Sequence, residues 1–184
     1  MNAFDKRGQG CRRARVRAIN DMRASIRRPL SVVIAAAFAI ATASANATEA
    51  SLRVFSVKDS FENVKEEVVD AIVKRGLVVD YTAHIGAMLA RTAKDVGASK
   101  TIYTNAQFVQ FCSATLSRRT MEADPTNIAF CPYTVFVYAL PESPGTTYVG
   151  YRPLPLVGSP QSKAAIDAVN TLLDGIAREA AGKK

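Results

Sequence analysis

The sequence predicts a two-layer α/β sandwich of the α+β class, in which helices pack on one face of a mixed β-sheet. Two observations predict it. Stretches with alternating apolar residues are followed by stretches with helical periodicity, in the order β-α-β-α-β-α-β-β-α. The last two strands are joined by a short turn, "PESPG". Elements that alternate in this way bury their apolar faces when the helices layer on one sheet.

The expected elements follow one another with few residues between them. In chain order they are strand 51–57, helix 59–76, strand 77–83, helix 85–97, strand 106–113, helix 113–125, strand 128–140, a returning strand within 146–155, and helix 159–184.

The N-terminal elements are predicted by periodicity and by their end signals. The first strand alternates apolar and polar residues, and the first helix carries an apolar stripe: Phe61, Val64, Val68 and Ile72. Asp59 and Glu62 have capping-box spacing at the start of this helix, and Gly76 suits a left-handed stop at its end. The next strand is rich in valine, and the short second helix ends at Gly97.

The C-terminal elements are predicted in the same way. Pro125 ends the third helix, and strand 128–140 is apolar on both faces, which places it centrally in the sheet. Pro153 confines the end of the returning strand to an edge. Ser159 caps the last helix, whose apolar stripe is Ile166, Val169, Leu173 and Ile176.

The N-terminus has the three parts of a secretory signal peptide. Arginines follow Met22, an apolar run extends from Leu30 to Ala43, and small residues come next. The run is shorter than the roughly 20 apolar residues that span a bilayer, so we expect no stable membrane anchor. We expect residues 1–47 to be a signal peptide, with Met22 as an alternative true start. The mature protein is then a single periplasmic domain of residues 48–184.

Charge argues against a nucleic-acid partner. The chain has 24 Lys and Arg against 16 Asp and Glu, but residues 1–47 hold nine of these basic residues and only two of the acidic ones. The predicted mature domain is therefore nearly neutral. A nucleic-acid-binding domain carries its positive charge on the folded part, where it neutralises phosphates.

Residues 111–138, "FCSATLSRRTMEADPTNIAFCPYTVFVY", carry a family resemblance. Cys112 follows a strand, the helix ends in the "EADP" turn (122–125), and the next apolar stretch opens with "CPYTVFVY" (131–138). With the preceding stretch "GLVVDYTAHIGAMLARTAKDVG", these features resemble the domain of unknown function 302 family over roughly residues 52–156. The resemblance implies a compact α/β domain, often a homodimer, and no established activity.

Cys112 and Cys131 admit four interpretations. They are a disulfide if their strands are antiparallel or staggered neighbours, two buried thiols, or metal or haem ligands. Alternatively, Cys112 is a working thiol whose pKa is lowered at the start of the helix carrying Arg118 and Arg119. The chain has no C-x-x-C motif to favour one of them.

His84 is the chain's single histidine, and it gives two further hypotheses. With Met88, four residues later, and Cys112, it would form a soft site for copper or haem. A turn or surface position is the alternative. Arg118 either clamps an anion or belongs to a solvated helix face.

Aromatic residues gather in the C-terminal half and suit a subunit interface or an apolar ligand groove: Phe130, Tyr133, Phe136, Tyr138, Tyr148 and Tyr151. One histidine and no G-x-S-x-G motif give no hydrolase triad. We therefore expect a non-enzymatic, homodimeric periplasmic module that holds a small ligand or protein partner near Cys112, His84 and Arg118. The alternatives are thiol redox or sulfur handling at Cys112, and copper or haem handling by His84 with a Cys or Met sulfur.

Overall fold

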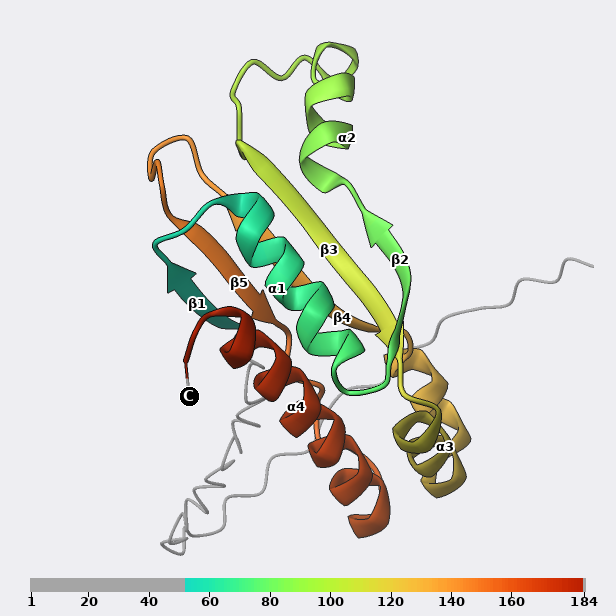
Figure 1. Cartoon of the computed structure of the whole chain (residues 1–184). Coiled ribbons are helices and arrows are strands. Elements are labelled where there is room, and N and C mark those ends of the chain that lie inside the picture. Colours follow the sequence, from blue (N-terminus) through green and yellow to red (C-terminus); the bar gives the residue numbers. More distant parts are fainter. Residues whose placement is uncertain (1–51, 184) are drawn as a thin grey trace, which may run out of the picture. The chain divides into compact units, whose positions relative to one another are not determined.

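The computed structural model describes residues 52–183 (Figure 1). The predicted signal peptide and the alternative start at Met22 lie outside these residues. No helix in the described part is long and apolar enough to cross a membrane. The elements, in chain order, are β1 (Arg53–Val57), α1 (Phe61–Val73), β2 (Val78–Ala83), α2 (Ile85–Thr92), the 3-10 helix η1 (Lys94–Val96), β3 (Asn105–Cys112), α3 (Ala114–Ala123), the 3-10 helix η2 (Pro125–Phe130), β4 (Tyr133–Ala139), β5 (Thr147–Tyr151) and α4 (Pro160–Ala180).

The α+β class, the order of the elements and the two-layer arrangement are confirmed, but the predicted mixed sheet is wrong. The strands lie in the order β1-β5-β4-β3-β2, and every neighbouring pair is antiparallel. Helix α1 connects β1 to β2, which form the two opposite edges of this sheet. No parallel crossover between neighbouring strands results, because the chain passes from one edge to the other.

Strand β4 lies in the middle of the sheet, as predicted. The returning strand β5 does not lie at an edge, because it pairs with both β1 and β4. It ends at Tyr151, before Pro153, so the proline removes no hydrogen bond from the ladder.

Helices α1 and α4 cover one face of the sheet (Figure 1). The predicted apolar stripes of both helices are buried there, and residues such as Val109, Val135, Val137 and Val149 meet them from the strands. The core therefore lies between these two helices and the central strands.

The ends of α1 differ in detail from the prediction. Ser60, rather than Asp59, is the N-cap, because its side chain accepts a hydrogen bond from the Asn63 amide. Asp59 instead accepts hydrogen bonds from the Ser60 amide and the Asn63 side chain. Gly76 has the predicted left-handed conformation, with φ of 72°.

Helices α2 and α3 lie at opposite ends of the sheet (Figure 1). The predicted helix 85–97 is divided into α2 and η1, and Gly97 ends it with φ of 67°. Asp124 caps η2 by accepting from the Thr126 amide. Because η2 extends to Phe130, the predicted strand 128–140 begins only at Tyr133. Cys131 therefore lies in a loop and not four residues into a strand.

The sheet face opposite α1 and α4, here called the open face, carries aromatic residues. Residues directly paired across an antiparallel ladder share a face. Phe108 pairs with Phe136, and Tyr138 pairs with Tyr148, so these four side chains lie together on the open face. All four are half-buried.

Candidate functional site

The two cysteines of the described residues lie side by side at one end of the sheet. Cys112 is the last residue of β3, and Cys131 is the C-cap residue that follows η2. Their Sγ atoms are 3.2 Å apart, and both residues are half-buried thiols. The sequence made the approach of the two sulfurs conditional on antiparallel or staggered strands, and β3 and β4 are antiparallel.

The antiparallel pairing of β3 with β4 accounts for the short distance. Phe111 pairs directly with Tyr133, so Cys112 leaves the ladder where the chain of Cys131 enters it. The intervening chain forms α3 and η2 and then returns to the end of β3, where Cys112 lies. Asn127 fixes this return, because its side-chain amide donates to the Thr120 carbonyl at 2.8 Å and to the Ser162 hydroxyl of α4 at 2.9 Å.

A polar chain leads from Cys131 into the core. The Ser117 Oγ lies 3.4 Å from the Cys131 Sγ and donates to the Tyr133 hydroxyl at 3.2 Å. Burial raises the pKa of Tyr133, so its phenol stays protonated at neutral pH. The Cys131 sulfur therefore has a hydroxyl beside it that can accept or donate a proton.

The environment of Cys112 does not favour its thiolate. Burial, the adjacent Cys131 and the Asp80 carboxylate together raise the pKa of Cys112 to about 12. This direction is opposite to the predicted lowering. The reason is positional: Ser113 is the N-cap of α3, and Cys112 belongs to the strand before it, next to Asp80.

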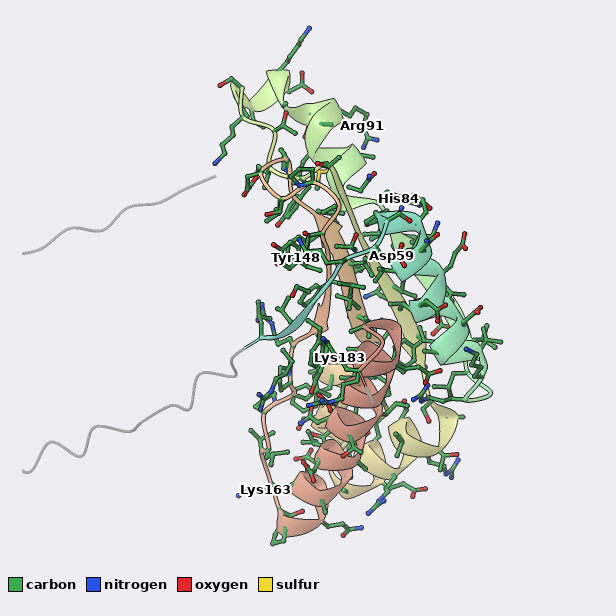
Figure 2. All side chains as sticks on the ribbon, turned by 60° about the vertical axis from the view of Figure 1, so that its left-hand side comes forward. Asp59, His84, Arg91, Tyr148, Lys163 and Lys183 are labelled. Atoms are coloured by element: carbon green, nitrogen blue, oxygen red, sulfur yellow. The ribbon has the colours of Figure 1, made fainter. Side chains whose placement is uncertain are left out.

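The structure does not bring His84 and Met88 to Cys112. His84 is exposed at the start of α2, beyond the end of β2 where Ala83 pairs with Phe108. Cys112 pairs with Val78 at the other end of β2, four residues along β3 from Phe108, or about 14 Å at about 3.4 Å per residue. Figure 2 shows His84 at the end of the domain that carries α2 and Arg91, with Lys163 at the other end. The predicted His/Met/Cys combination is therefore not formed.

Two further predicted sites are a metal site at the cysteines and an anion clamp at Arg118. Within residues 52–183, no three His, Cys, Asp or Glu side chains form a group that could hold a metal ion. The Arg118 side chain is 80% exposed, and its Nε donates to Glu122 Oε1 at 2.8 Å, one helical turn away. Arg118 thus lies on a solvated face of α3, which was the alternative interpretation of this residue.

A groove of about 790 Å³ lies along the open face. Strands β3 and β4 supply its floor, and the chain around Phe130 and the segment after β5 supply its sides. The lining is mainly aromatic and aliphatic, including Tyr103, Phe108, Phe130, Phe136, Tyr138 and Leu154. We call this the open-face groove. The predicted aromatic set therefore divides. Tyr151 is buried in the core and does not line the groove, whereas Phe130, Phe136 and Tyr138 line it. Tyr133 belongs to the core and also contributes to the lining.

Stacked tyrosines hold one end of the groove. The rings of Tyr138 and Tyr148 stack with centroids 4.9 Å apart, and Tyr103 meets Tyr138 edge-on at 5.7 Å. Burial raises the pKa of Tyr138. Figure 2 shows Tyr148 beside the sheet, away from α4. These contacts fix the aromatic rings before a ligand arrives.

Arg152 is the single charged residue among those that line the groove. It is exposed, and it forms no ion pair with any other residue in the described part of the chain. Sequence reasoning did not select Arg152, Phe108 or Tyr103 as site residues. The "YRPLP" stretch contained a signal, since an arginine between an aromatic residue and prolines follows a strand directly, but only the fold shows that it meets the aromatic residues.

Comparisons with known proteins agree with this fold. The family model described as "Domain of unknown function DUF302" matches residues 53–180. A solved structure described as an uncharacterized conserved protein DUF302 from Bacillus stearothermophilus aligns with a TM-score of 0.58 and 17% identity, over 70% of this chain and 97% of that one. A comparison with curated proteins finds no match. With the family model covering most of the chain, this protein belongs to the DUF302 family.

Proposed function

We propose that the protein is an exported, non-enzymatic periplasmic module that binds a small amphipathic ligand, with an apolar body and an anionic group, in the open-face groove. The single observation that carries this proposal is the composition of the groove: about 790 Å³ lined by apolar and aromatic side chains with one positive charge, Arg152. Export is supported by the charged start, the apolar run and the small residues in the N-terminal sequence.

The size and lining suit a small molecule. Ligand pockets have volumes of roughly 300–1,000 Å³ and are mostly apolar, with a few polar groups that fix the orientation of the ligand. Here the uncharged polar residues of the lining are Thr134 and Gln107, together with Tyr103, Tyr133 and Tyr138. Aromatic rings bury large areas with little loss of rotamer entropy, so Phe136 and Tyr138 would contribute most of the apolar contact.

The positive charge of Arg152 fixes where the anionic group of the ligand would bind. A guanidinium presents several N–H donors in one plane and binds a carboxylate or sulfonate more strongly than a neutral partner. Since no acidic side chain lines the groove, no neighbouring carboxylate neutralises the positive charge of Arg152 there. The ligand's anionic group would lie at Arg152, and its apolar body would lie over Phe136.

Self-association forms the second part of the proposal. Beside the groove, the edge strand β2 exposes two apolar side chains on the open face, Val78 at 72% and Tyr81 at 60%. They pair with Cys112 and Gln110, which places them on the same face as the groove but outside its lining. A second copy that covers this edge would bury them and leave the groove free.

Two fluorescent probes test the ligand proposal. 1-Anilinonaphthalene-8-sulfonate carries an aromatic body and an anion, and N-phenyl-1-naphthylamine carries the same body without the anion. We expect both to bind the folded protein saturably. Arg152→Gln should weaken the anionic probe about tenfold, because a charge-assisted contact is lost, and should leave the neutral probe unchanged.

The control is Arg91→Gln, which removes an exposed arginine from α2, outside the groove. It should change the binding of neither probe. The proposal fails if neither probe saturates, and the assignment of Arg152 fails if its substitution weakens both probes equally. Export is tested separately by the intact mass of protein recovered from the periplasm, which should lack the leader.

A further inference from the structure

The Cys112 and Cys131 sulfurs lie close enough to bond after a small movement. Their 3.2 Å separation exceeds a disulfide bond of about 2.05 Å by little more than one ångström. Cys131 lies in a loop between η2 and β4, so it can move without breaking a pairing of the sheet. Both residues are half-buried, so an external reagent can reach them.

We propose that Cys112 and Cys131 form a reversible dithiol/disulfide couple that reacts by exchange with an external disulfide. This inference goes beyond ligand binding and does not depend on it. It assigns a covalent modification site to the end of β3, and the substrate class is a small or peptide disulfide.

Cys112 and Cys131 have different neighbouring groups, and these groups indicate which of the two sulfurs attacks first. Two groups act on Cys112: the Cys131 thiol from the loop and the Asp80 carboxylate from β2. The Tyr133 phenol from β4 lies near enough for the charge of either sulfur to raise its own pKa. The carboxylate and the neighbouring thiol both favour the protonated form of Cys112. Cys131 instead has the Ser117 hydroxyl at 3.4 Å, which can rotate its proton away from Tyr133 and donate it to a thiolate. Cys131 is therefore the first nucleophile.

The exchange proceeds in two balanced steps. The Cys131 thiolate attacks one sulfur of the external disulfide, a mixed disulfide forms, and the other half leaves as a thiolate that takes up a proton. Cys112 then loses its proton to solvent and attacks the Cys131 sulfur, which releases the second half as a thiol. Two protein thiols become one disulfide, and the external disulfide is reduced to two thiols.

The second step should be the slow one. Its rate depends on the fraction of Cys112 present as thiolate, which rises roughly tenfold for each pH unit below its pKa. Forming the mixed disulfide removes the Cys131 thiol, one of the groups that disfavour the Cys112 thiolate, but burial and Asp80 remain. The mixed disulfide should therefore accumulate near neutral pH and close faster at higher pH.

The test uses the full chain with Cys11→Ser, so that Cys112 and Cys131 are the two remaining cysteines. Reduced protein is mixed with glutathione disulfide between pH 7 and pH 9, quenched with acid and examined by intact mass. We expect one glutathione adduct first and then a species lacking two hydrogens. With Cys112→Ser the adduct should persist, and with Cys131→Ser the adduct should form much more slowly.

Matched variants separate chemistry from folding. Asp80→Asn should speed the closing step several-fold at pH 7, whereas Asp95→Asn in η1 should not. Circular dichroism confirms that each variant is folded. The proposal is overturned if the treated protein still titrates two free thiols, or if Cys131→Ser is modified as fast as Cys112→Ser. Probe binding in the open-face groove is scored independently, so failure of one proposal leaves the other standing.

Discussion

Phe136 of β4 lies against Gly150 of β5, its direct partner in the sheet. A β-carbon at position 150 would lie 2.9 Å from the Phe136 Cζ atom and 2.1 Å from the Arg53 carbonyl oxygen. Gly150 therefore allows two close approaches at once: the ring that lines the open-face groove, and the backbone of the edge strand β1.

Gly150→Ala should destabilise the protein strongly. The Phe136 ring can move by rotating, but the Arg53 carbonyl is backbone and can move only if β1 shifts. Overpacking typically costs about 1–3 kcal/mol, and we expect the free energy of unfolding, measured by urea denaturation, to fall by at least about 2 kcal/mol.

Gly175→Ala in α4 is the control, because its β-carbon would meet only the flexible end of Arg75 at 3.3 Å. That variant should be unchanged or more stable by up to about 1 kcal/mol. Equal losses from both substitutions would contradict this account.

Asn127→Ala should unfold at a lower denaturant concentration than the native protein. Asn127 is 2% exposed, and its side chain donates to the hydroxyl of Ser162, which is fully buried. Losing a buried partner costs about 1–3 kcal/mol. Asn63→Ala is the matched control, because its side-chain hydrogen bond to Asp59 is exposed, and we expect a change within about 0.5 kcal/mol. A loss no larger at Asn127 than at Asn63 would argue against the tie between η2 and α4.

Stability should fall in strongly alkaline solution because of Tyr151. Burial, and then the hydrogen bond to Asp174, raise the pKa of Tyr151 from 10.0 to about 12. The folded form therefore holds the phenol proton to higher pH than the unfolded chain does. This contribution is fully present below pH 10 and is lost as the pH rises through about 12. Urea denaturation should show a steeper decline over this range for native protein than for Tyr151→Phe. Parallel curves would contradict the assignment.

The double substitution Val78→Ser with Tyr81→Ser should convert the proposed homodimer to a monomer. It removes the two exposed apolar side chains of the β2 edge. Light scattering coupled to size-exclusion chromatography measures the change. Val96→Ser with Ile128→Ser is the control, since those residues are 74% and 65% exposed elsewhere on the domain. A native protein that is monomeric at every concentration tested would remove the self-association proposal.

Most helices of this fold could be predicted because α1 and α4 carry apolar stripes, and because Gly76, Gly97 and Pro125 mark where the first three helices end. The direction of strand pairing could not. Alternation along a strand is the same in parallel and antiparallel ladders, and a strand-helix-strand order usually implies a parallel crossover. Here β1 and β2 occupy opposite edges, so the helix between them spans the sheet instead.

The cysteine pair was predicted in part. The sequence placed Cys112 near Cys131 only on the condition of antiparallel or staggered strands, and the antiparallel pairing is known only from the fold. The direction of the pKa shift of Cys112 depends partly on Asp80, which comes from another strand. The aromatic residues suggested either an apolar ligand groove or a subunit interface, without saying which side chains would line it. Arg152 joins them because the chain after β5 lines the same groove as β3 and β4, and no local sequence pattern indicates that placement.

The pairing of Val54 with Gly150 joins two distant points of the sequence. Such long-range closures slow folding, because the entropy of a large loop must be lost before the contact forms. During synthesis, which starts at the N-terminus, β1 has no partner until β5 has been made. The sheet is therefore completed late, and β1, the first strand in the chain, is unpaired for the longest time.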